Sequence, residues 1–422
     1  MVKMPPRLTA DICDRAPVGR KDMEKLMKTT YEKLRSELLD SCVPFWLENA
    51  VDEVHGGILN CVDRFGKVYS EDKSVWMQGR AGWMFSYLYN NIEKNPRYLE
   101  FAKSCIDFAT NHCIDSDGRM FFTVTRDGKP LRKRRYWFSE TFYIIANAEY
   151  YMATGDEGYL DTARRYFDFV YGMYLDPATD PYKITPKSYA ETRNTKALAN
   201  PMIMLNVSSV MRDADKENFD KYDGIITGLI ADIKCFYKSE YHAMFENINA
   251  EDNSVILDSA PCRVINPGHD IECAWFLLDE AIKRGDRELA DFASLVFDEA
   301  FERGWDKEYG GITYFKDVLG LPVEAYEHDM KLWWPHNEAA ISSLMLYQYT
   351  KNKKYKRIFK QVLAYSFTHF SDREYGEWFG YLRRDGKPTE PPCKGHTYKG
   401  PFHVMRMLAK CVLMLENEKG EN

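Results

Sequence analysis

The sequence has no apolar run long enough to cross a bilayer, and residues 1–21 mix charges with prolines instead of forming the hydrophobic segment of a signal peptide. We therefore expect a cytosolic protein without a membrane partner. The ten cysteines include no Cys-x-x-Cys pair, which argues against a zinc site or a disulfide framework. The Walker lysine loop, the dinucleotide Gly-x-Gly-x-x-Gly, the Gly-x-Ser-x-Gly elbow and His-Glu-x-x-His are also missing. Common phosphoryl-transfer, hydride-transfer, serine-hydrolase and zinc-protease motifs are thus excluded.

The chain has fewer positively than negatively charged residues. Its 57 Lys and Arg and its 64 Asp and Glu give a net charge of −7. The basic run at residues 132–135 is only four residues long. A nucleic-acid partner is therefore disfavoured. Aromatic residues, in contrast, make up 14% of the chain and hydrophobic residues 45%. This composition is typical of a globular protein with an aromatic-rich interior or pocket.

A repeat appears in four glycine-containing, strand-like segments. They are residues 56–67, 118–129, 310–315 and 376–387. The first two begin 62 residues apart and the last two 66 apart, and the 192 residues between the second and third equal three units of 64. These spacings predict six units in total, with two degenerate copies near Tyr182 and His242. Each copy is typical of a β-hairpin with a glycine turn.

Two helices fit between successive hairpins. The first helix of each pair is apolar on most faces: Ser74–Tyr89, Phe138–Ala153, His269–Lys283 and Leu332–Tyr349. The second is amphipathic, as in Tyr98–Asn111 and Arg287–Arg303. A period of about 65 residues with one buried and one half-buried helix predicts an all-α fold, an (α/α)6 barrel of six helical hairpins with short β-hairpins in the loops at one end. We expect one catalytic domain over residues 1–422, with 1–19 as an irregular extension.

Several polar residues share one phase of this repeat. Arg80, Glu140, Glu338 and His403 lie 22 to 28 residues after the glycine of their unit, and His269 has a similar offset from His242. A ring brings equivalent positions together, so these side chains should converge on a pocket at its mouth. Other roles stay open: Arg80 as a paired core arginine, Glu140 as a helix cap, and Glu338 as the partner of a sugar or a pocket arginine.

The two histidines carry the chemistry. His269 and His403 each have a charged residue three positions later, Glu272 and Arg406, on the same helical face. Imidazoles remove and return protons near neutral pH, which suits inversion or isomerisation at carbon. Glu272 is expected to hold the tautomer of His269. A metal site is the weaker interpretation because no second histidine or cysteine lies at ligand spacing, and we expect no metal.

A set of motifs in fixed order carries a resemblance to a known family. The motifs are Val75–Arg80, Phe138–Glu140, Asn266–His269 with Glu272 and Trp275, Trp333–Glu338, Glu377–Tyr381 and Lys399–Arg406. The chain resembles the N-acylglucosamine 2-epimerase family, related to cellobiose 2-epimerases and aldose–ketose isomerases, from about Trp46 to Leu415. The resemblance implies a barrel that is commonly dimeric, no cofactor for the chemistry, and in some members modulation by a nucleotide such as ATP.

The resemblance also assigns roles. His269 and His403 match the family's acid/base histidines, and Arg80 matches its sugar-binding arginine. Residues expected to bind substrate are Glu272, Trp275, Trp334, Glu338, Glu140, Asn200 and Arg406. We thus predict a sugar 2-epimerase that acts on N-acylglucosamine, N-acylmannosamine or a related aldose through an enediolate at C2. Alternatives are an aldose–ketose isomerase, a cellobiose or mannose 2-epimerase and, more distantly, a glycoside hydrolase or a non-catalytic sugar-binding protein.

Overall fold

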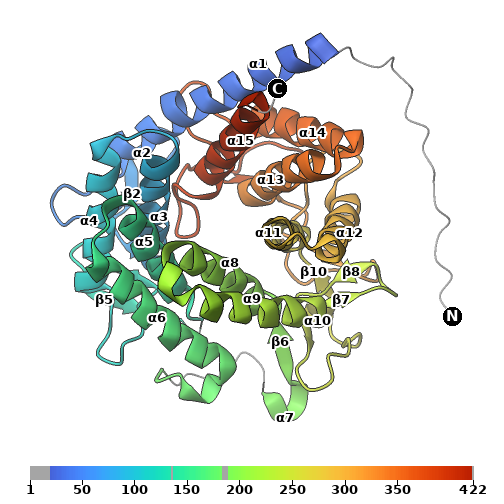
Figure 1. The fold of residues 1–422 in the computed structure, drawn as a ribbon, viewed down its shortest axis with the longest axis horizontal. Coiled ribbons are helices and arrows are strands. Elements are labelled where there is room, and N and C mark those ends of the chain that lie inside the picture. The colour runs from blue at the N-terminus through green and yellow to red at the C-terminus, as the bar shows by residue number, and fades with distance from the viewer. Residues whose placement is uncertain (1–19, 135, 183–188, 421–422) are drawn as a thin grey trace.

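The computed structural model describes residues 20–134, 136–182 and 189–420, which form a ring of two concentric helical layers (Figure 1). The inner helices are α3 (Val75–Asn91), α5 (Phe138–Thr154), α8 (Ala199–Ala214), α11 (Pro267–Arg284), α13 (Trp333–Thr350) and α15 (His403–Gly420). Outside them lie α4 (Pro96–His112), α6 (Glu157–Leu175), α9 (Phe219–Lys234), α12 (Arg287–Gly304) and α14 (Lys353–His369). The expected (α/α)6 barrel is confirmed, and the predicted helix ends agree within two residues.

The sixth hairpin is assembled from the two ends of the chain. The first segment contains α1 (Arg20–Ser36), the π-helical η1 (Glu37–Cys42) and α2 (Val43–Asn49), and α1 packs on α15 (Figure 1). The 64-residue period did not reveal this pairing because its two helices lie at opposite ends of the sequence. Short helices in the connections are η2 (Pro177–Thr179), α7 (Ala190–Arg193), η3 (Lys216–Asn218) and α10 (Ala260–Arg263).

The alternation of helix character follows from burial. The inner helix α5 has thirteen buried residues over its first thirteen positions, Phe138 to Tyr150, whereas the outer helix α12 buries one stripe from Leu289 to Phe301. Each large apolar side chain removed from water contributes about 1.5–3 kcal/mol. Local signals end the helices, since Gly155 and Gly285 adopt left-handed conformations after α5 and α11.

The loop strands differ in part from expectation. Local hairpins are formed by β1 (Cys61–Val62) with β2 (Val68–Ser70), β4 (Thr123–Val124) with β5 (Pro130–Arg132), and β7 (Tyr237–Lys238) with β8 (Ala243–Met244). The segments after Gly310 and Gly376 instead pair across units: β11 (Lys316–Asp317) with β10 (Val264–Ile265), and β13 (Tyr381–Leu382) with β12 (Lys331–Leu332). Two further pairs also connect different units: β3 (Lys73–Ser74) pairs with β4, and β6 (Thr195–Ala197) pairs with β9 (Asn247–Asn249). The degenerate copy near Tyr182 runs into residues 183–188, outside the described residues.

Three buried ion-pair clusters link neighbouring loops. Each joins an aspartate to a buried lysine and to an arginine from another loop: Asp52 with Lys73 and Arg126, Asp306 with Lys331 and Arg384, and Asp372 with Lys394 and Arg64. Because Arg64 belongs to the first hairpin and Asp372 to the last loop, the third cluster closes the ring. Burial would raise the pKa of Asp372, but hydrogen bonds from Arg64 and Lys394 lower it to about 2.

Replacement of Asp372 by alanine is expected to lower the free energy of unfolding by about 3–5 kcal/mol, since it leaves the fully buried Lys394 without its carboxylate. Urea denaturation measures this loss. Glu374→Ala is the control, because Glu374 binds the same Arg64 at 3.0 Å but is 65% exposed, and its loss should cost less than about 1 kcal/mol. Equal midpoints for the two variants would contradict a role of the cluster in ring closure.

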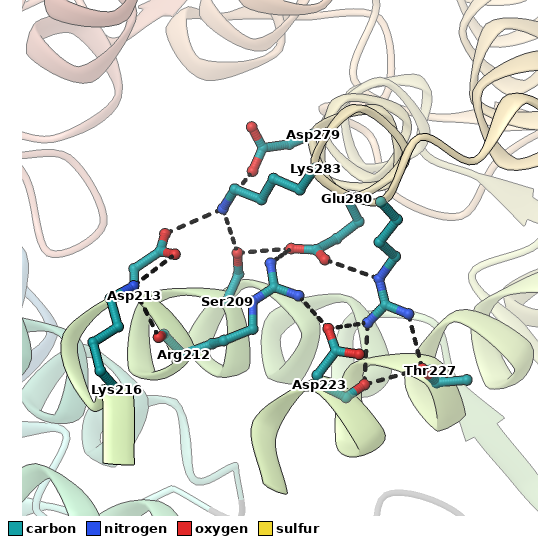
Figure 2. Close-up of polar contacts among 10 residues, drawn as sticks. Ser209, Arg212, Asp213, Lys216, Asp223, Thr227, Asp279, Glu280 and Lys283 are labelled. Atoms are coloured by element: carbon teal, nitrogen blue, oxygen red, sulfur yellow. Dashed lines mark hydrogen bonds and ion pairs between the residues drawn. The ribbon is translucent and has the colours of Figure 1, made fainter. Parts of the chain in front are cut away.

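A second polar network, at the other end of the helices, holds α8 and α9 against α11 (Figure 2). Glu280 of α11 is 1% exposed and accepts hydrogen bonds from Arg212 at 2.7 Å and from Ser209 at 2.8 Å, both on α8. Lys283 contacts Asp213 at 3.1 Å. Charge-assisted hydrogen bonds of this kind fix the position of α8 in the ring.

Candidate active site

A cavity of about 830 Å³ opens where the inner helices begin. Residues from the first turns of all six inner helices line it, so that six positive helix ends are directed towards its contents. Six of the predicted site residues are in the wall: Arg80, His269, Glu272, Trp334, His403 and Arg406. Chain segments more than 300 residues apart in sequence therefore meet in one pocket.

Trp334 lies beside both candidate catalytic histidines. Its ring centroid is 5.1 Å from that of His269 and 6.0 Å from that of His403. Gly268 permits this packing, because a Cβ at that position would lie 2.6 Å from the Trp334 ring. The two imidazoles thus approach the same region of the cavity from the starts of α11 and α15, with α13 between them.

His269 is held by a residue that the sequence did not suggest. Its Nδ1 lies 2.8 Å from Oε1 of Glu246, whereas Glu272, the expected partner, pairs with Arg406 instead. We correct that assignment. Burial would lower the pKa of His269, but the charge and hydrogen bond of Glu246, with the charge of Glu272, outweigh it and raise the pKa above its ordinary value.

His403 has the opposite environment. Its Nδ1 lies 2.8 Å from Oε1 of Glu338, and its side chain is only 9% exposed. Burial and the positive charges of Arg406 and Arg80 hold the pKa of His403 well below its ordinary value. With Nδ1–H donated to Glu338, the neutral ring presents the unprotonated Nε2 as a base.

Glu338 and Glu272 share a buried cation. Arg406 donates to Oε1 of each carboxylate at 2.7 Å, and Trp275 donates Nε1–H to Oε2 of Glu338 at 2.7 Å. Glu272, Glu338 and His403 also offer atoms within 4.8 Å of one another, a spacing that could suit a metal ion. Because Arg406 already occupies one oxygen of each carboxylate, this cluster fits acid–base chemistry better than metal ligation.

Arg80 is another cation of the cavity wall and differs from Arg406 in its partners. Among the described residues it has no carboxylate within ion-pair distance, and its Nη1 donates to the carbonyl oxygen of Tyr398 at 3.2 Å. The rings of Phe142 and Phe402 lie 4.2 and 5.0 Å from its guanidinium carbon. Burial lowers its pKa, so an anion placed in the cavity would stabilise it.

Four predicted site residues do not line this cavity. Glu140 is fully buried and pairs with Arg119 at 2.6 Å, Asn200 lies on α8 outside the wall, and Trp275 and Glu338 lie beneath the wall, in contact with it. The position of Glu140 in the repeat correctly predicted that it lies on an inner helix. It could not show that Glu140 is paired with Arg119. His336, a residue of the Trp333–Glu338 motif, has a structural role: both ring nitrogens bind backbone groups, and burial lowers its pKa to about 3.

Sequence reasoning also missed several residues of the wall. They include Arg134, Asn206, Tyr314, Tyr326 and Tyr398. Arg134 belongs to the basic run 132–135, which was considered only as evidence for or against a nucleic-acid partner, and Asn206 lies on the inner helix of a degenerate unit. For Asn206 a signal existed, since a lone amide interrupts the apolar stretch 201–207.

No helix of the described residues is long and apolar enough to traverse a bilayer. Comparison with known proteins matches residues 56–405 to the family model of N-acylglucosamine 2-epimerase. The N-acylglucosamine 2-epimerases of Bos taurus and Homo sapiens are 38% and 36% identical to the chain, over 90% and 94% of its length and 90% and 93% of theirs. The solved cellobiose 2-epimerase of Spirochaeta thermophila superposes with a TM-score of 0.80 at 24% identity, over 94% of this chain and 98% of that one. The chain belongs to the N-acylglucosamine 2-epimerase family.

Proposed function

We propose that this carbohydrate epimerase inverts C2 of an N-acylated hexosamine, interconverting N-acylglucosamine and N-acylmannosamine, with His269 and His403 as its two acid/base groups. The opposed environments of the two imidazoles, both beside Trp334, are the observation that carries the proposal. The substrate class rests on the likeness to the animal epimerases. The C1 carbonyl of the open-chain sugar acidifies the proton at C2, so one imidazole can remove it and the other can protonate the opposite face.

The two environments support an assignment of roles in the proposed mechanism. His403 is neutral and serves as the base, while His269, whose pKa Glu246 raises, carries the proton that is delivered. In the reverse direction the roles exchange. One proton is removed and one is added, so the reaction is redox-neutral and needs no electron-accepting cofactor.

Arg80 is positioned to stabilise the intermediate. Removal of the C2 proton places negative charge on the C1 oxygen, as an enolate when C2 bears an acylamino group and as an enediolate when it bears a hydroxyl group. A desolvated guanidinium without a carboxylate partner interacts more strongly with that oxygen than with the neutral aldehyde. The helix N-termini around the cavity add to the same field.

An aldose–ketose isomerase would use the same intermediate but protonate C1. Incubation with N-acetylmannosamine, mannose and cellobiose in deuterated water separates the two reactions. An epimerase keeps the aldehyde and incorporates deuterium at C2, whereas an isomerase forms a ketose labelled at C1. The proposed function is contradicted if no sugar acquires deuterium at C2.

Two rivals are less well supported. A glycoside hydrolase needs two carboxyl groups at one cavity, but Glu140 is held by Arg119 and Glu338 by Arg406, and neither lines the wall. A non-catalytic sugar-binding protein needs no pair of imidazoles with opposite pKa shifts. Nucleotide modulation, a homodimer and a cytosolic location stay predictions from the sequence.

The basic limb of the pH profile is expected to depend on Glu246. Because this carboxylate raises the pKa of His269, Glu246→Gln should lower that pKa, so kcat/KM in the direction that uses His269 as acid should fall at lower pH than in the wild type. The glutamine oxygen can still accept Nδ1–H, so the ring orientation is preserved. Glu299→Gln is the matched control, since Glu299 binds His242 at 2.9 Å outside the cavity. Identical limbs in both variants would contradict the assignment of His269.

A further inference from the structure

One wall of the cavity differs in chemistry from the rest. The helix α8 presents a single face, at spacings of three and four residues: Ala199, Met202, Ile203, Asn206 and Val207. Four of these side chains are apolar, and Phe276 of α11 and Ile145 of α5 continue the apolar surface on either side. The charged groups of the cavity lie on other helices and in loops. In the ring, α8 is across the cavity from α15, which carries His403 (Figure 1).

Asn206 is the polar exception in this wall. It is partly buried, and its amide makes no hydrogen bond to any described residue. The contrast with Asn147 of the neighbouring inner helix is clear, since Asn147 donates Nδ2 to the carbonyl oxygen of Tyr143 at 2.8 Å. Buried amides are ordinarily satisfied, so the donor and acceptor of Asn206 are available to a bound molecule.

The two histidines leave this wall free for the C2 substituent. When the C2 proton is removed, C2 becomes planar, and the two imidazoles must lie on its two faces. The substituent on C2 stays in the plane between them, so it contacts a part of the cavity wall that neither histidine occupies. An acylamino group offers an N–H, a carbonyl oxygen and an apolar chain, which match an amide surrounded by aliphatic side chains.

We propose that Asn206 hydrogen-bonds the acylamino group at C2, and that Met202, Ile203 and Val207 contact its acyl chain. This inference rests on the proposed function and names the groups that select the substrate. Asn206 is a specificity-determining residue, because it contacts neither of the protons that move. A sugar with a hydroxyl group at C2 would leave the apolar stripe unfilled and the amide incompletely bonded, which disfavours it.

The test compares two open-chain alditols that bind but do not react, N-acetylmannosaminitol and mannitol, by inhibition constants or calorimetry. The wild type should bind the acetamido compound more tightly. Asn206→Leu should weaken that binding roughly 10- to 100-fold and leave mannitol within about threefold. Asn91→Leu, the same change at an exposed position of α3 outside the cavity, should alter neither. Ile203→Phe, which fills the apolar wall, should also weaken the acetamido compound selectively.

Equal weakening of both alditols by Asn206→Leu, or an undiminished preference, would overturn the role of Asn206. That result would leave the proposed function intact if the wild type still incorporates deuterium at C2 of N-acetylmannosamine. A wild type that exchanges the C2 proton of no sugar would instead refute the proposed function itself. The two failures are therefore distinguishable.

Discussion

Replacement of either His403 or His269 by asparagine should lower kcat for epimerisation by about 10²–10⁴-fold, because each variant loses one of the two proton-transfer groups. Both rings line the same cavity, and neither can substitute for the other if each faces one side of C2. Asparagine is small and polar, so the fold should persist. Circular dichroism and thermal unfolding check that it does.

The labelling pattern is the sharper measurement. A variant with one imidazole can still remove a proton from one epimer and return it to the same face. In deuterated water, each variant should therefore exchange the C2 proton of one epimer without inverting it, and the two variants should act on opposite epimers. Comparable turnover in either variant, or exchange of both epimers by one variant, would exclude the two-histidine mechanism.

The sequence predicted the parts of the site that depend on local periodicity. His269, His403 and Arg80 fall at one phase of the repeat, and a ring converts equal phase into proximity. These three residues could be found because the helix period and the unit length are visible in the sequence. Arg406 was noted for its position three residues after His403, and Trp334 was predicted only from the resemblance to the family.

The partners of those residues were harder to find, since they come from other units. Glu246 holds His269 from the segment between β8 and β9, 23 residues earlier, and Glu338 holds His403 from α13, 65 residues earlier. The sequence suggested Glu272 for His269 because spacings of three residues are obvious, yet Glu272 turns to Arg406 on α15. The same reason hid the pairing of α1 with α15 and the strand pairings between units. Contacts between different units of the ring do not produce a periodic pattern in the sequence.

Glu338 should matter as much as the histidines, although it does not reach the cavity. It is fully buried, and its carboxylate accepts hydrogen bonds from His403, Arg406 and Trp275. Glu338→Gln keeps the size but replaces one acceptor oxygen by a donor, which then faces either His403 and Arg406 together or the Nε1–H of Trp275. In either orientation the negative charge beside Nδ1–H of His403 is lost. The tautomer of His403 that presents Nε2 as a base loses its support. We expect kcat to fall by about 10²–10⁴-fold, with KM little changed.

The same substitution should cost about 3 kcal/mol or more of unfolding free energy, because it leaves Arg406 with one carboxylate in a buried site. Glu280→Gln is the matched control: Glu280 is 1% exposed and pairs with Arg212 at 2.7 Å on another face of the ring (Figure 2). It should lose similar stability but keep its turnover. If Glu338→Gln loses stability and keeps kcat, Glu338 does not position His403. If Glu338→Gln abolishes release of sugar from an aryl glycoside while His403→Asn does not, the protein is a glycoside hydrolase, and the epimerase mechanism is wrong.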